Sequence, residues 1–177
     1  SSSYRKIFFF KRNIIKSQNF RCQKLLGGNF QLTTSGGLKV ISRDTTHSDY
    51  MVFNQVIVNK EYQFVLDFLN FHNLTNPIIV DCGANVGYTS LFFLKSLSNS
   101  IVFAVEPSLE NAKVLMENLR INNFDKRAEL LVNGIHSEGG MALDLQTGFR
   151  DSKDWAFRTQ PVSNGTGLTS ITIAEIQ

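Results

Sequence analysis

The alternation of apolar and polar stretches divides the middle of the chain into strands and helices. Residues 78–80 form a β-branched run after Pro77, which is typical of a buried parallel strand. The apolar run 86–97 predicts a crossover helix, and the run 101–105 predicts a second buried strand. The order strand, helix, strand predicts an α/β fold with a Rossmann-like sheet and flanking helices.

The same pattern predicts the helices and strands in the rest of the chain. Residues 27–34 and 38–42 predict a small hairpin whose turn is residues 34–37, and residues 50–71 predict a helix interrupted at Asn59 and Lys60. Further along, the pattern predicts a helix at 111–119, strands at 129–132, 141–145 and 170–173, and a long loop at 146–167.

Residues suited to ligand binding lie where the first two buried strands end. Asp81 closes the first strand, and Gly83 and Gly87 allow the backbone to bend sharply and to approach a ligand. Glu106 ends the second strand, 25 positions after Asp81, where a carboxylate can accept two hydrogen bonds from a ribose diol, and Pro107 ends that strand. The turn lacks the Gly-x-Gly-x-x-Gly that seats a pyrophosphate on a helix N-terminus, which favours a nucleoside without phosphates.

These residues resemble the S-adenosylmethionine-dependent methyltransferases, and within them the FkbM-type family. The resemblance rests on Val80-Asp81-Cys82-Gly83-Ala84-Asn85-Val86-Gly87-Tyr88-Thr89-Ser90, on Val105-Glu106-Pro107-Ser108 with Glu110-Asn111, and on the approach segment from Ser48 to Val56 and Glu61-Tyr62. It spans residues 44–176, and Cys82 stands where the family usually has valine.

The resemblance implies the cofactor S-adenosylmethionine, a Rossmann-like sheet, and methyl transfer to a hydroxyl on a sugar or secondary metabolite. It implies that Asp81 and the backbone around Gly83 hold the methionine part, that Glu106 holds the ribose, and that Asn133 to His136 lie near adenine. The cofactor-binding residues it predicts are Asp81, Gly83, Ala84, Asn85, Gly87, Glu106, Pro107 and Asn133. No catalytic base can be named.

Particular residues of this motif also have other interpretations. Taken alone, Asp81 is equally well explained as a cap for the following helix, Glu106 as a solvated acid and Gly87 as a packing residue. For His136, an ordinary exposed loop histidine is the favoured interpretation. On the same fold, the alternative enzyme is a nicotinamide-dependent oxidoreductase. The alternative outside enzymes is a non-catalytic membrane-surface or scaffold module.

That last alternative rests on the basic and aromatic residues of the first 24 positions. They predict an amphipathic helix. Two interpretations of this helix are peripheral contact of residues 4–24 with anionic lipid and packing on the chain's own domain. Packing on the chain's own domain is favoured. The net charge of +3 is too small to imply a nucleic-acid surface. His47 and His72 carry no ligand spacing, so no metal site is expected.

The remaining expectations concern organisation and compartment. We expect residues 1–43 to form a basic N-terminal helix and hairpin, and residues 44–177 the cofactor-binding part of a methyltransferase domain truncated at its C-terminus. Two cysteines make no disulfide framework, which favours a reducing, cytoplasmic compartment.

Overall fold

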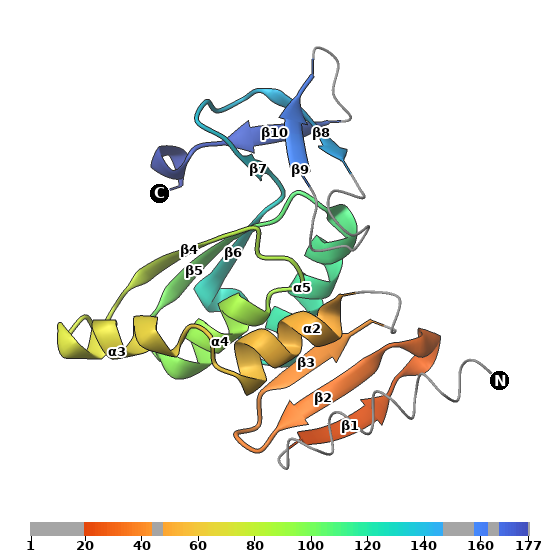
Figure 1. Ribbon diagram of the computed structural model, residues 1–177, viewed down its shortest axis with the longest axis vertical. Helices are drawn as coiled ribbons and strands as arrows, with labels where there is room; N and C mark the ends of the chain where they lie inside the picture. Colours follow the sequence, from red (N-terminus) through yellow and green to blue (C-terminus); the bar gives the residue numbers. More distant parts are fainter. Residues whose placement is uncertain (1–19, 44–47, 147–157, 163–166, 177) are drawn as a thin grey trace.

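The computed structural model describes residues 20–43, 48–146, 158–162 and 167–176. In this part of the chain the strands form an antiparallel meander β1-β2-β3, a parallel sheet β4-β5-β6 and a mixed sheet in the order β7-β10-β8-β9. Figure 1 shows a layer of helices between the meander and the parallel sheet, with the mixed sheet beyond the opposite side of the parallel sheet. The predicted α/β class with a parallel sheet and flanking helices is confirmed.

The meander consists of β1 (Phe20–Lys24), β2 (Phe30–Thr34) and β3 (Lys39–Ser42). The predicted hairpin is confirmed as β2 and β3, although Gly27 belongs to the short 3-10 turn Leu26–Gly28 rather than to a strand. The predicted N-terminal helix is wrong for Phe20–Lys24, because this segment pairs with β2 as a strand. Its exposure alternates with a period of two, and Phe20 and Cys22 pack against the core. The rest of that expected helix, residues 1–19, lies outside the described residues.

The predicted interrupted helix is present as three pieces. They are α2 (Asp49–Phe53), a π-helical segment (Asn54–Val58) and α3 (Gln63–Phe71). Lys60 takes a left-handed φ of 51°, which ends the first two pieces where the polar Asn59-Lys60 pair predicts a break.

The parallel sheet contains β4 (Ile78–Cys82), β5 (Ile101–Val105) and β6 (Ala128–Leu131), joined by α4 (Tyr88–Ser96) and α5 (Leu109–Ile121). One face of this sheet packs on the two helices through residues such as Val102 and Ala104, which are fully buried. The other face leaves Ile78 68% exposed, and no helix of the described residues covers it.

The mixed sheet contains β7 (Gly134–Ile135), β8 (Ala142–Gln146), β9 (Arg158–Pro161) and β10 (Leu168–Ile171), followed by the 3-10 turn Ile173–Glu175. The prediction of one long loop over 146–167 is wrong at β9, which pairs antiparallel with β8. The polar composition of this stretch does not predict a strand, because an edge strand needs few apolar residues.

The meander and the parallel sheet share one hydrophobic core, which includes Leu32, Val40, Leu91 and Leu115. Asn118 of α5 joins these layers by hydrogen bonds: its Oδ1 accepts from the backbone N–H of Ile41 at 2.6 Å, and its Nδ2 donates to the carbonyl of Val86 at 2.8 Å. Asn118 is completely buried, so its amide is the partner on which both backbone groups depend.

We therefore predict that Asn118→Leu destabilises the chain by about 2–4 kcal/mol, since it leaves a buried N–H and a buried C=O unpaired. Urea unfolding followed by circular dichroism measures the loss. The matched control is Glu117→Gln on the same helix, which removes only the exposed pair with Arg120 and should cost less than about 0.5 kcal/mol. Equal effects of the two substitutions would contradict the bridging role of Asn118.

Candidate functional site

The turn between β4 and α4 is held in an unusual backbone shape. Gly83, Asn85 and Gly87 all have left-handed φ values, of 78°, 52° and 85°. The N–H groups of Gly83 and Ala84 both donate to the carbonyl of Val105 at 2.9 Å, which ties the turn to the end of β5. The glycines are needed because most side chains resist this conformation, and asparagine tolerates it.

The Glu106 carboxylate lies at the end of β5 and is held on several sides. Its Oε2 accepts from the backbone N–H of Asn85 at 2.8 Å, and its Oε1 accepts from the N–H of Ser108 at 2.9 Å and from Nδ2 of Asn111 at 3.2 Å. The side chain is only 4% exposed, and burial raises the pKa of this carboxyl, while these hydrogen bonds and the nearby Arg43 lower it. Glu106 is therefore a buried, oriented acceptor rather than a solvated acid.

A cavity of about 230 Å³ opens beside this carboxylate. The turn, the start of α5 and the helix before β4 all contribute to its wall. The lining residues are Val52, Gln55, Val56, Tyr62, Gly83, Ala84, Asn85, Thr89, Glu106, Pro107 and Asn111. The volume lies just below the range of about 300–1,000 Å³ typical of small-molecule pockets, so it suits part of a ligand such as a nucleoside.

The approach helix is fixed to the rest of the site by a buried ion pair. Arg43, just after β3, donates from Nη2 to Oδ1 of Asp49 at 2.7 Å and from Nε to Oδ2 at 3.0 Å. Asp49 is fully buried at the start of α2. This pair sets the position of the helix that carries Val52 and Gln55 to the cavity.

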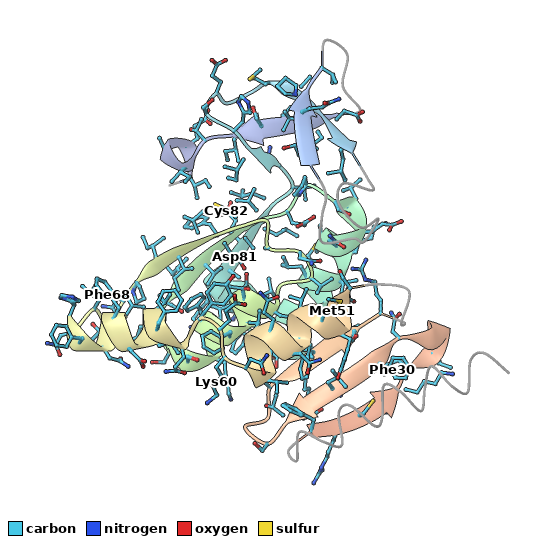
Figure 2. All side chains as sticks on the ribbon, in the orientation of Figure 1. Phe30, Met51, Lys60, Phe68, Asp81 and Cys82 are labelled. Atoms are coloured by element: carbon cyan, nitrogen blue, oxygen red, sulfur yellow. The ribbon has the colours of Figure 1, made fainter. Side chains whose placement is uncertain are left out.

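Asp81 turns toward the helices rather than into the cavity. Its Oδ2 accepts from Oγ of Ser90 at 2.6 Å, and the backbone N–H of Ser90 also hydrogen-bonds to the carboxylate, which places Asp81 as a cap on the first turn of α4. Figure 2 shows Asp81 and Cys82 on opposite sides of β4. Burial raises the pKa of Asp81 despite these hydrogen bonds.

The cap also bears on the kind of ligand that the site can take. A helix N-terminus is the usual seat of a pyrophosphate, and here the carboxylate of Asp81 occupies the first turn of α4. The carboxylate of Asp81 thus takes the position at which a pyrophosphate would otherwise meet the helix.

The structure brings most of the predicted site residues together and separates three. Gly83, Ala84, Asn85, Glu106 and Pro107 line the cavity. Asp81, Gly87 and Asn133 do not.

The last two of these residues have other surroundings. Gly87 packs against Leu115, and Nδ2 of Asn133 donates to Oγ1 of Thr169 at 3.0 Å in the mixed sheet. His136 is also outside the lining, and its Nδ1 accepts from the N–H of Glu138 at 3.2 Å.

The sequence reading missed several wall residues, notably Asn111, Gln55, Tyr62 and Thr89. Asn111 was detectable in principle, because Ser108 is a helix N-cap and the first turn after it must pass the carboxylate of Glu106. Gln55 and Tyr62 lack such a signal, since only the packing of the π-helical segment and of the residue before α3 brings them to the turn.

The parallel sheet and its flanking helices define the class of fold, an α/β domain, with a glycine turn at the carboxyl edge of the sheet and a buried acid at the end of the next strand. The sequence profile described as "Methyltransferase FkbM domain" matches residues 81–176, more than half of the chain. The chain belongs to the FkbM methyltransferase family, as the motif resemblance predicts.

Individual relatives match shorter stretches. "Methyltransferase sdnD" of Sordaria araneosa is 35% identical over 66 residues, which cover 37% of this chain and 26% of the relative. The chain thus spans about a quarter of the length of this curated relative.

Two solved structures are similar to this chain. The SAM-dependent methyltransferase from Agrobacterium tumefaciens has a TM-score of 0.50 at 16% identity, covering 63% of this chain and 34% of that one, and it supports the fold. P. horikoshii TYW2 in complex with MeSAdo has a TM-score of 0.34 at 24% identity, covering 38% and 25%.

Two further features of the described residues concern metal binding and membrane crossing. No group of three or more potential metal ligands comes together among them. None of their helices combines the length and the apolar character that crossing a bilayer requires.

The packing of Gly87 gives a testable consequence. A Cβ at this position would lie 2.8 Å from Cγ of Leu115, and the φ of 85° is unfavourable for alanine. We predict that Gly87→Ala destabilises the chain by about 2–5 kcal/mol in urea unfolding, the sum of conformational strain and overpacking. The control is Gly37→Ala, where φ is 79° and no atom lies within 4 Å, so strain alone should cost about 1–2 kcal/mol. If both variants lose the same stability, the close approach of α5 to the turn is not a constraint.

The raised pKa of Asp81, a half-buried acid, predicts a pH-dependent effect. Because its pKa is raised in the folded chain, wild-type stability falls as pH rises from the pKa of the unfolded chain through that of the folded chain. Asp81→Asn keeps an acceptor for Ser90 without this charge, so its stability relative to wild type should increase between pH 3 and pH 7 in thermal unfolding. The exposed Asp125→Asn should show no such increase. If the difference in stability between Asp81→Asn and wild type does not change with pH, the burial of the Asp81 charge costs nothing.

Proposed function

We propose that the cavity beside Glu106 binds the nucleoside part of S-adenosylmethionine and that the domain serves an S-adenosylmethionine-dependent methyl transfer. The observation that carries this proposal is the buried carboxylate of Glu106, oriented by three N–H donors at the edge of the glycine turn. Membership of the FkbM family supports the same cofactor.

The residues present fit a ribose on chemical grounds. Glu106 lines the cavity with a carboxylate, a group that accepts hydrogen bonds and donates none when ionised. Such an acceptor matches a ligand that brings hydroxyl donors. It does not match a phosphate, which brings acceptors and negative charge.

The cofactor supplies a methyl group that its sulfonium already activates. The chain's contribution is therefore positional: Glu106 orients the ribose, the backbone of the turn approaches the ligand closely, and Val52, Val56 and Tyr62 limit the access of water. The residues described do not identify a base.

We further propose that the acceptor is a hydroxyl oxygen on a small molecule or glycan, so that the reaction is an O-methylation. This class of acceptor is supported by the resemblance to FkbM-type enzymes. Asp81, Gly87 and Asn133 remain candidates for the cofactor site in this proposal, with Asp81 and Gly87 acting by shaping the turn.

Calorimetric titration with S-adenosylhomocysteine tests the cofactor assignment. Glu106→Gln removes the charge that strengthens hydrogen bonds from the ribose, so we expect a loss of affinity of roughly 10- to 100-fold. Glu110→Ala, an exposed acid four residues along the chain, is the control and should bind as wild type does.

The same titration with NADH examines the oxidoreductase alternative. We expect no NADH binding, because Asp81 already caps the first turn of α4. Binding of NADH by a folded chain that does not bind S-adenosylhomocysteine would overturn the methyltransferase assignment.

A further inference from the structure

The outer strand β6 of the parallel sheet is unpaired along one edge. Among the described residues it pairs only with β5, in the order β4-β5-β6 (Figure 1). A strand edge presents free N–H and C=O groups to other strands, and folded chains commonly block such edges with basic residues or proline. The edge strands β1 and β9 carry arginine, lysine or proline, whereas β6 has the sequence Ala-Glu-Leu-Leu. The edge of β6 therefore lacks the side chains that usually prevent pairing.

An apolar groove lies between this strand and α5, with a volume of about 700 Å³. The apolar residues that line it are Met116, Leu119, Ala128, Leu130 and Val132. Met116 is 59% exposed and Val132 is 36% exposed, so the groove leaves hydrophobic side chains in contact with water. None of the lining residues belongs to the cavity beside Glu106, so the groove is separate from the candidate cofactor site.

Two charged residues lie at opposite ends of the groove. Because α5 begins after the carboxyl end of β5 and ends before β6 begins, it runs opposite in direction to β6. Lys113, near the start of α5, thus lies toward the carboxyl end of β6, and Asp125 precedes its amino end. Both side chains are exposed, and neither forms an ion pair with a described residue. The other charged lining residues, Glu117 and Arg120, pair with each other.

The side chains of β6 suit an antiparallel pairing of this strand with itself. Residues 128, 130 and 132 share one face of the strand, because successive side chains alternate, and all three line the groove. In a pair centred on Leu130, Ala128 lies opposite Val132 of the second copy, and Glu129 lies opposite Leu131. Apolar side chains therefore meet on the groove face, and the two Glu129 charges are not directly opposed.

We propose that β6 and the groove beside it form the interface of a two-fold symmetric dimer of this chain. The two copies of β6 pair antiparallel, and Lys113 of each copy contacts Asp125 of the other. A second copy is the partner that fits, because the charges at the two ends of the groove are opposite and exchange places under the two-fold axis. The inference goes beyond the proposed function and does not depend on it.

Sedimentation equilibrium of the 177-residue chain tests the dimer. We expect a monomer–dimer equilibrium in the range of about 1–100 µM. Lys113→Asp and Asp125→Lys each place two pairs of like charges across the interface, so each change alone should weaken dimerisation about tenfold. Combining the two changes restores opposite charges, and the double variant should dimerise within about threefold of wild type.

Val132→Lys examines the apolar part of the same interface. It places a charge opposite Ala128 of the second copy and should weaken dimerisation by about tenfold or more. The matched control is Ile78→Lys, which replaces an exposed apolar side chain on β4, the other outer strand of the same sheet. This control should dimerise as wild type does. Circular dichroism shows that each variant is folded, and if Val132→Lys is not, the charge reversals alone decide.

Three results would overturn the proposal. The first is a wild-type chain that stays monomeric over the whole concentration range. The second is a dimer that is lost in Ile78→Lys and kept in Val132→Lys, since its interface then lies at β4. The third is a double charge reversal that dimerises no better than the single ones, because Lys113 and Asp125 then do not meet. The cofactor assignment is measured separately, by binding of S-adenosylhomocysteine, and none of these results changes it.

Discussion

The burial of the Glu106 carboxylate is the constraint around which the site is built. A charge at 4% exposure is costly, and here backbone N–H groups of the glycine turn and of the start of α5 compensate for it. Because these donors come from both sides of β5, the acid joins two loops into one wall. The left-handed backbone at Asn85 follows from this requirement, since it aims that residue's N–H at the carboxylate.

The meander contributes to the same site through contacts that are distant in sequence. Asn118 links Ile41 of β3 to the turn at Val86, the hydroxyl of Tyr88 donates to the carbonyl of Ile41 at 2.7 Å, and Arg43 holds the start of α2. The N-terminal sheet thus supports the glycine turn, and the helix that lines the cavity is fixed from the same side.

Much of this could be predicted from local sequence. The β-branched runs ending in Asp81 and Glu106 place two parallel strands, and Asn59-Lys60 marks the helix break, because each signal acts within a few residues. The missed elements lack a local signal. The charged and aromatic residues of β1 are compatible with both the helical and the strand period, so the segment was assigned to a helix. β9 is a polar edge strand without an apolar pattern. Asn111 was visible as a motif residue, but its hydrogen bond to Glu106 was not.

The sequence by itself determined the family, the class of fold and the pairing of a glycine turn with an acid one strand later, because these depend on residue type and spacing along the chain. Only the tertiary structure decided how the site residues divide their work. Asp81 caps α4, Gly87 packs against Leu115, and Asn111 donates a hydrogen bond to the carboxylate of Glu106. Such roles depend on which groups meet when separate elements pack, and spacing along one strand or helix does not encode those distances.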